Sequence, residues 1–383
     1  MDFELTKEQK DIRQAAREFA EGEFDKDLAA QLDKEHAFPR SIWKKACELG
    51  FVGMHYPEEY GGQGLGVLEN ALVVEEFCRR DSGIGTALAL CDFASEIIMR
   101  HGTKEQKERL LPAIASGRMI SAGCFTEPNH GSDITTMDTT AVRDGDSWVL
   151  NGTKTFITNG CIADCFITLC QTDPGVRPGY RGQSLILVEK GAAGLEAAEV
   201  GDKMGIRMTS TAEVSYTSVR ASAASLVGEE NRGFYHVLEF FDESRAEIAA
   251  TAVGIAQGAF DRALEYAKQR EQFGQRLADF QVTQHKLADM ATTIEAARLL
   301  TYRAAWNFDQ GRIDPKFTSM AKYFAGRAAV AVTDEAVQIL GGYGYILENE
   351  VERFYRDAKI TEIYEGTKEI QKNTIAGSLI KKK

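Results

Sequence analysis

Apolar residues recur at helical spacing along the first third of the chain. Ile12, Ala16 and Phe19 lie three or four residues apart, and Thr6 with Gln9 forms a capping-box pattern ahead of them. The same kind of pattern predicts further helices, over about 39–49, 67–80, 82–100 and 103–116. We therefore expect a helical N-terminal domain, residues 1–117.

The pattern changes to short β-rich runs after about residue 118. These runs are separated by turn sequences such as Asn151-Gly152, and they cover about 119–126, 147–150, 155–158, 166–171 and 184–188. Because these runs are short, rich in β-forming residues and separated by turns, the sequence predicts a β domain over residues 118–230.

Long helical patterns return from Phe234 onward. The first carries small residues at helical spacing, including Ala252, Ala259 and Ala263, which allow neighbouring helices to approach closely. Further helices are expected over about 277–309 and 315–340, the second ending at two glycines. We expect a mainly α fold with a β insert, in which residues 231–383 form a helical bundle.

Composition argues against several kinds of partner and site. The 383 residues carry a net charge of −12, which argues against a nucleic acid, since such partners require a basic surface. No run approaches the roughly 18 apolar residues of a membrane span, and the opening residues predict a charged helix rather than a signal peptide. The seven cysteines lack zinc-ligand spacing. We expect a cytoplasmic protein with free thiols and no metal site.

A glutamate followed by glycine stands out near the C-terminus, in Tyr364-Glu-Gly-Thr367. Read alone, Glu365 is a solvated turn residue, because glutamate is mostly exposed. The segment nevertheless resembles the C-terminal signature of the acyl-CoA dehydrogenases. Blocks at Pro57–Gly62, Thr126–Asp133 and Lys154–Gly160 resemble the same family in the same order, over essentially the whole chain.

The resemblance implies three domains of the acyl-CoA dehydrogenase fold, FAD as cofactor, an acyl-CoA substrate and Glu365 as the catalytic base. It assigns flavin contacts to Phe125, Thr126, Ser132, Phe156, Thr158, Arg270, Phe273, Phe280, Gln281, Gln338, Gly341, Gly342, Thr367 and Glu369. Many relatives have tryptophan where this chain has Phe156, so an aromatic face is kept. The block over 338–342 is one that meets the nucleotide from a neighbouring subunit in the family.

The resemblance also places five residues at the substrate: Ser132, Asp242, Arg245, Tyr364 and Gly366. Without the family, Arg245 reads as half of an ion pair on a helix surface. Some relatives carry their catalytic glutamate directly before this arginine. Here that position is Ser244, so Glu365 fills the only base position that remains.

Asp92 lies among apolar residues in the region that lines the acyl pocket of relatives. One interpretation is a hydrogen-bonded residue with a structural role. The other is a second catalytic base, acting at a ring carbon in the 1,4-dehydrogenation of cyclohex-1-ene-1-carbonyl-CoA. Similarity to the alicyclic branch of the family favours the second interpretation, and the alternative is a short- or medium-chain enzyme acting on straight-chain acyl-CoA.

The resemblance further implies an electron-transfer flavoprotein as electron acceptor and a homotetramer. Two other classes of protein, acyl-CoA oxidases and non-catalytic flavin-binding scaffolds, agree less well with the sequence. Acyl-CoA oxidases are usually much longer chains. A non-catalytic flavin-binding scaffold would lack the base and have a basic surface, whereas Glu365 is present and the charge is −12.

Overall fold

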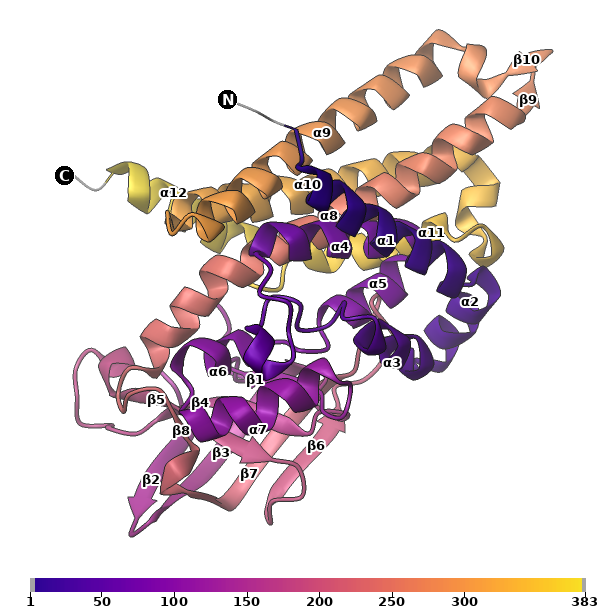
Figure 1. Ribbon diagram of the computed structural model, residues 1–383. Helices are drawn as coiled ribbons and strands as arrows, with labels where there is room; N and C mark the ends of the chain where they lie inside the picture. Colours follow the sequence, from indigo (N-terminus) through magenta and orange to yellow (C-terminus); the bar gives the residue numbers. More distant parts are fainter. Residues whose placement is uncertain (1–3, 381–383) are drawn as a thin grey trace.

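The computed structural model describes residues 4–380. Seven α-helices form the first part of the described chain (Figure 1). These are α1 (Lys7–Glu23), α2 (Lys26–Glu35), α3 (Arg40–Glu48), α4 (Val67–Arg80), α5 (Ser82–Ala89), α6 (Ser95–His101) and α7 (Lys104–Ala115). The capping box at Thr6 is present, because its side chain accepts from the Gln9 N–H and the Gln9 side chain bonds the Thr6 N–H.

One helix expected over 82–100 is in fact two helices, α5 and α6. Ala94, between them, has a left-handed backbone with φ 70°, and the Ser95 N–H bonds the carbonyl of Asp92. Residues 90–94 contain no glycine or proline, so the sequence gives no sign of this break. The break matters for function, because it places Asp92 in a turn.

Eight strands form one mixed sheet below the helices in Figure 1. They are β1 (Ser121–Cys124), β2 (Thr140–Asp144), β3 (Ser147–Thr158), β4 (Cys165–Gln171), β5 (Gln183–Glu189), β6 (Leu195–Glu199), β7 (Thr211–Ser222) and β8 (Leu226–Val227). The order is β6-β7-β3-β2-β4-β5-β8, and β1 pairs in parallel with β4. The runs expected over 147–150 and 155–158 belong to the single strand β3, whose pairing with β7 is interrupted by bulges.

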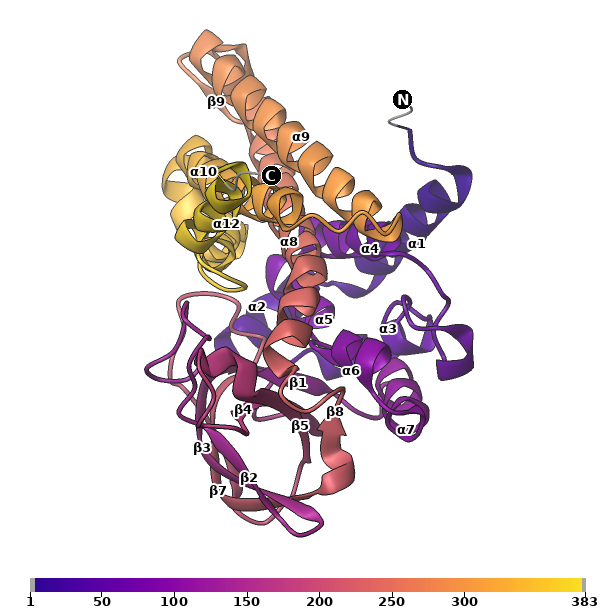
Figure 2. The ribbon, with the colours of Figure 1, turned by 90° about the vertical axis from the view of Figure 1, so that its left-hand side faces the viewer.

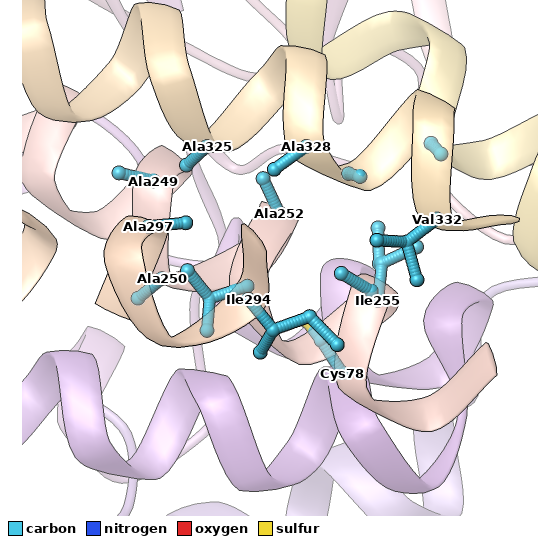
Figure 3. Packing of buried hydrophobic residues seen from close by; sticks show 14 of the residues in the cluster. Cys78, Ala249, Ala250, Ala252, Ile255, Ile294, Ala297, Ala325, Ala328 and Val332 are labelled. Atoms are coloured by element: carbon cyan, nitrogen blue, oxygen red, sulfur yellow. The ribbon is translucent and has the colours of Figure 1, made fainter. Parts of the chain in front are cut away.

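The last part of the chain forms the bundle. It contains α8 (Gly233–Gln269), a small hairpin of β9 (Glu271–Gln272) and β10 (Gln275–Arg276), α9 (Gln281–Asp309), α10 (Pro315–Leu340), α11 (Val351–Ala358) and α12 (Lys368–Ile380). Figure 3 shows small side chains of α8, α9 and α10 meeting in its core, such as Ala252, Ala297 and Ala328. The small-residue pattern thus serves close helix packing, and the predicted α, β, α architecture is confirmed.

Helix α8 joins the two ends of the molecule. Its first residue, Gly233, packs so closely on the backbone of Ser184 in β5 that an added Cβ would lie 2.6 Å away. Its other end carries the β9–β10 hairpin at the far tip of the bundle (Figures 1 and 2). Among the described residues, no helix is long and apolar enough to cross a membrane.

Candidate active site

Glu365 lies in a tight turn between α11 and α12. Its φ is 54° and that of Gly366 is 85°, so two successive residues have left-handed backbones. The Gln371 side chain donates to the carbonyls of both residues, at 2.9 and 3.0 Å, and Lys322 donates to the Gly366 carbonyl at 2.6 Å. A strained glutamate backbone persists only where its surroundings hold it, as they do here.

The Glu365 carboxylate is held by α8. The Ser244 hydroxyl donates to Oε2 at 2.7 Å. Burial raises the pKa of Glu365, while the Ser244 bond and the nearby charges of Arg245 and Lys322 oppose that rise. The group is therefore a partly buried carboxylate whose ionised form is stabilised by one donor and two cations, which is what a general base requires.

Arg245 and Asp242 face the interior rather than the surface. Their exposed fractions are 7% and 9%, and Arg245 Nη1 donates to Asp242 Oδ1 at 3.3 Å. Burial raises the pKa of Asp242 to about 6, although Arg245 counteracts it. The interpretation of Arg245 as part of a surface ion pair is therefore wrong, because the pair exists but is buried, on either side of Ser244 in the sequence.

Asp92 is buried, with 9% of its surface exposed, and it accepts a hydrogen bond from the Gly53 N–H at 3.2 Å. Burial raises its pKa to about 6, and the negative charge of Glu243 adds to the effect. Burial also raises the pKa of Glu247 on α8, and the negative charges of Asp92 and Glu365 add to that rise. Asp92 thus lies close enough to Glu243 and Glu247 on α8 for their charges to interact, and Glu247 interacts in the same way with Glu365.

Strand β3 presents an aromatic surface. Phe156 has φ 55° and an exposed fraction of 66%, and it lies within the irregular pairing between Lys154 and Ile157. A bulge re-aims a side chain, here turning an apolar ring outward. Thr158 ends the same strand, and the buried Lys154 anchors it through an ion pair with Glu127 at 2.8 Å. An outward phenylalanine on a fixed strand is suited to cover one face of a planar ligand.

Phe125 lies differently from Phe156. It is 5% exposed, and its ring packs against Phe93, Phe240 and Phe241 at centroid distances of 6.5, 6.1 and 5.8 Å. Its ring therefore belongs to a core between the sheet and α8. In the loop that follows, the Thr126 carbonyl accepts a hydrogen bond from the Thr155 N–H at 2.9 Å, and Ser132 is exposed.

A second group of expected flavin contacts lies at the bundle tip. Arg270, Gly341 and Gly342 line one pocket of about 460 Å³, and Phe273, with φ 54°, is 96% exposed. Phe280 packs edge-on against Phe273 at 6.5 Å, and both Gln281 and Gln338 are exposed. A guanidinium beside two glycines with accessible backbone suits a pyrophosphate.

These two groups do not meet within one chain. Ser244 and Arg270 are separated along α8 by about 39 Å at 1.5 Å per residue, and Thr367 and Glu369 lie at the start of α12, next to Glu365. The residues present nevertheless fit FAD, because an outward ring platform and a cationic, glycine-lined pocket are both available. A second copy of the chain would have to supply one of the two.

Comparison with known proteins identifies the class. Models of the acyl-CoA dehydrogenase N-terminal, middle and C-terminal domains match residues 6–118, 122–219 and 231–380. The chain belongs to the acyl-CoA dehydrogenase family of FAD-dependent oxidoreductases, and FAD is its cofactor.

Several relatives align from end to end. A short-chain specific acyl-CoA dehydrogenase of Clostridium acetobutylicum is 42% identical, and the match covers 100% of both chains. Butyryl-CoA dehydrogenase from Megasphaera elsdenii has a TM-score of 0.95 at 39% identity, with 100% of both chains covered. A chain of the solved structure "Electron transferring flavoprotein of Acidaminococcus fermentans" has a TM-score of 0.96 at 42% identity, again with full coverage. The names of these relatives give no support to the expected alicyclic substrate.

Sequence reasoning missed the groups that tune Glu365. The sequence marks Ser244 only as an unfilled base position, but its hydroxyl donates to Glu365, the expected base. Lys322 and Glu247 gave no signal, because each lies within an ordinary helical pattern and reaches the site only through packing.

Proposed function

We propose that this enzyme oxidises a short, straight-chain acyl-CoA thioester to the enoyl-CoA with its double bond next to the thioester carbonyl. The observation that carries the proposal is the Glu365 carboxylate, buried, hydrogen-bonded to Ser244 and flanked by Arg245 and Lys322. The names of its relatives, short-chain and butyryl-CoA dehydrogenase, support the choice of acyl group.

The residues divide the work of breaking two C–H bonds. Glu365 takes the proton from the carbon next to the carbonyl, using Oε1, while Ser244 holds Oε2 in place. The Glu365 N–H polarises the thioester oxygen, so that negative charge developing there meets a fixed donor. Bound FAD would supply the acceptor for the hydride that leaves the next carbon, a role that no side chain can fill. Tyr364 and Gly366 shape the substrate side of the turn.

The test is an anaerobic titration of the purified holoenzyme with butyryl-CoA, followed through the visible absorbance of the flavin. We expect butyryl-CoA to bleach the flavin. Glu365→Gln should retain FAD but reduce it about 10²- to 10⁴-fold more slowly, the usual contribution of a positioned base. Reduction of the variant at the wild-type rate would overturn the role of Glu365.

A second candidate substrate is an alicyclic thioester such as cyclohex-1-ene-1-carbonyl-CoA, with Asp92 as second base. The observation favouring it is that Asp92 is a buried carboxylate with a raised pKa. Its charge acts on Glu247, which in turn interacts with Glu365. Bleaching by the cyclic thioester that is lost in Asp92→Asn, with butyryl-CoA turnover retained, would select this candidate. Bleaching by butyryl-CoA alone would leave Asp92 with a structural role.

We further propose that the reduced enzyme passes its electrons to an electron-transfer flavoprotein and works as a homotetramer. The similarity to a chain solved in a study of an electron transferring flavoprotein supports the first point. The separation of the two flavin-contact groups supports assembly, since one chain cannot complete the site. Faster re-oxidation by such a flavoprotein than by oxygen would test the electron acceptor.

A further inference from the structure

A cluster of two histidines and a glutamate lies away from the active site, where α6 meets the start of α8. His101 is the last residue of α6, and His236 and Glu239 lie one turn apart near the start of α8. One ligand atom from each residue lies within 4.8 Å of the others. His101 Nε2 is 2.9 Å from Glu239 Oε2, and the two imidazole rings stack with centroids 3.8 Å apart.

His236 is the residue that ordinary packing does not explain. It is 8% exposed, and within the described part of the chain neither of its ring nitrogens has a hydrogen-bond partner. A buried polar atom without a partner destabilises the folded state, because it has lost its hydrogen bonds to water. Gly228 makes room for the ring: its φ is 75°, and an added Cβ would lie 2.6 Å from His236 Nε2 and 3.2 Å from the Cβ of His101.

We propose that His101, His236 and Glu239 bind a divalent transition-metal ion, of which Zn²⁺ suits this donor set best. Two imidazoles and one carboxylate form a known class of zinc site, in which water occupies the fourth position. Ligand atoms around tetrahedral zinc lie about 3.3 Å apart, given metal–ligand distances of about 2.0–2.2 Å. To bind zinc, each pair of ligand atoms must therefore come closer by about 1.5 Å at most. A rotation of the two stacked imidazole rings would bring their nitrogens together.

Access and charge also suit a cation. The Glu239 side chain is 55% exposed and that of His101 20%, so an ion can enter from solvent. Three cations act on the two histidines: Arg100, Lys107 and Arg232. Arg100 pairs with Glu243 and Arg232 lies over the Tyr235 ring, while Glu229 adds negative charge near His236. The ion would join α6 to α8 one turn before Asp242.

A second group with metal-ligand chemistry provides a contrast. Glu127, His130 and Asp138 also gather within 4.8 Å. There the Glu127 carboxylate already accepts from Lys154 at 2.8 Å and from the N–H groups of Asp138 and Thr139 at 2.6 and 2.9 Å. The buried ammonium opposes a second cation, so this group carries no metal in our proposal.

The test measures zinc in the untagged, FAD-loaded enzyme after EDTA treatment and equilibrium dialysis against buffered Zn²⁺. We expect about one zinc per chain and a rise in Tm with Zn²⁺ but not with Mg²⁺, which avoids imidazole. Glu239→Gln and His236→Gln should each bind at least tenfold more weakly and lose the Tm rise. His130→Gln should bind as the wild type does.

Each other outcome would overturn the proposal. Absence of stoichiometric zinc in the wild type would mean that the histidine stack is packing alone. Unchanged binding in Glu239→Gln, an exposed position whose substitution does not threaten folding, would place the ion elsewhere. Loss of zinc in His130→Gln would point to the group at Glu127 instead.

Discussion

At the scale of the residue, the chemistry depends on a single hydroxyl. Ser244 donates to the ionised Glu365 carboxylate and so lowers its pKa against the rise caused by burial. A hydrogen bond to a charged group is worth about 1.5–3 kcal/mol, or about one to two pKa units. Ser244 thus keeps a carboxylate that burial would protonate in its ionised form, in which it can accept a proton.

We predict that Ser244→Ala raises the pKa of Glu365. Because the base must be deprotonated, activity is lost as pH falls through that pKa, and a raised pKa moves the loss to higher pH. The acid limb of the kcat/KM profile for butyryl-CoA should shift upward by about one unit. Ser378→Ala, an exposed hydroxyl on α12, is the control. An unshifted profile in Ser244→Ala would mean that another group sets the limb.

Phe156 has a strained, left-handed backbone and an exposed apolar ring. We expect bound flavin to cover this ring. Phe156→Ala should therefore weaken FAD retention about tenfold, since aromatic contacts contribute about 0.5–1.5 kcal/mol beyond buried area. Phe156→Trp should retain FAD. Release of flavin on dilution, followed by fluorescence, measures both variants. Equal retention in all three proteins would show that the ring faces no ligand.

At the scale of the element, the turn between α5 and α6 carries an electrostatic cost. Asp92 has an ordinary pKa of 3.8, which burial raises to about 6 in the folded protein. The native state therefore binds this proton more tightly than the unfolded state does. Its stability falls as pH rises between about 4 and 6, and the cost persists at neutral pH.

We predict that Asp92→Asn stabilises the protein at pH 7.5 by about 1–3 kcal/mol, and that this gain falls to about a third near pH 4.5. The asparagine carbonyl can still accept the Gly53 N–H, so the fold of the turn is retained. Thermal unfolding at both pH values measures the effect. Asp202→Asn, at a side chain that is 98% exposed, is the control. Destabilisation by Asp92→Asn at pH 7.5 would show that the charge itself is needed by the fold.

The same elements show how far sequence reasoning extends. Long helices such as α4 and α10 were predictable, because capping signals and helical spacing act over many neighbouring residues. The break at Ala94 and the bulge at Phe156 were not, since both depend on non-glycine residues held at positive φ by tertiary contacts. The motif around Glu365 indicated the base, but not its partner on α8, which is distant in the sequence.

At the scale of the whole molecule, the position of the cofactor depends on assembly. The residues expected at the flavin ring lie near Ser244, and those expected at its pyrophosphate lie near Arg270, about 39 Å away along α8. The family resemblance assigned the block over 338–342 to a neighbouring subunit, but it made no such assignment for Arg270. The geometry of α8 separates Arg270 from Ser244.

We predict that two different inactive variants restore each other in a mixed oligomer. Glu365→Gln lacks the base but keeps Arg270, whereas Arg270→Ala keeps the base but should bind FAD weakly. If Arg270 serves the site of a neighbouring chain, co-expression at limiting FAD should create some intact sites. Random pairing in a two-fold symmetric assembly gives about one quarter of wild-type activity. Separately expressed variants, mixed after purification without subunit exchange, provide the baseline. Activity no higher than that baseline would mean that Arg270 does not contribute to the FAD site of a neighbouring chain.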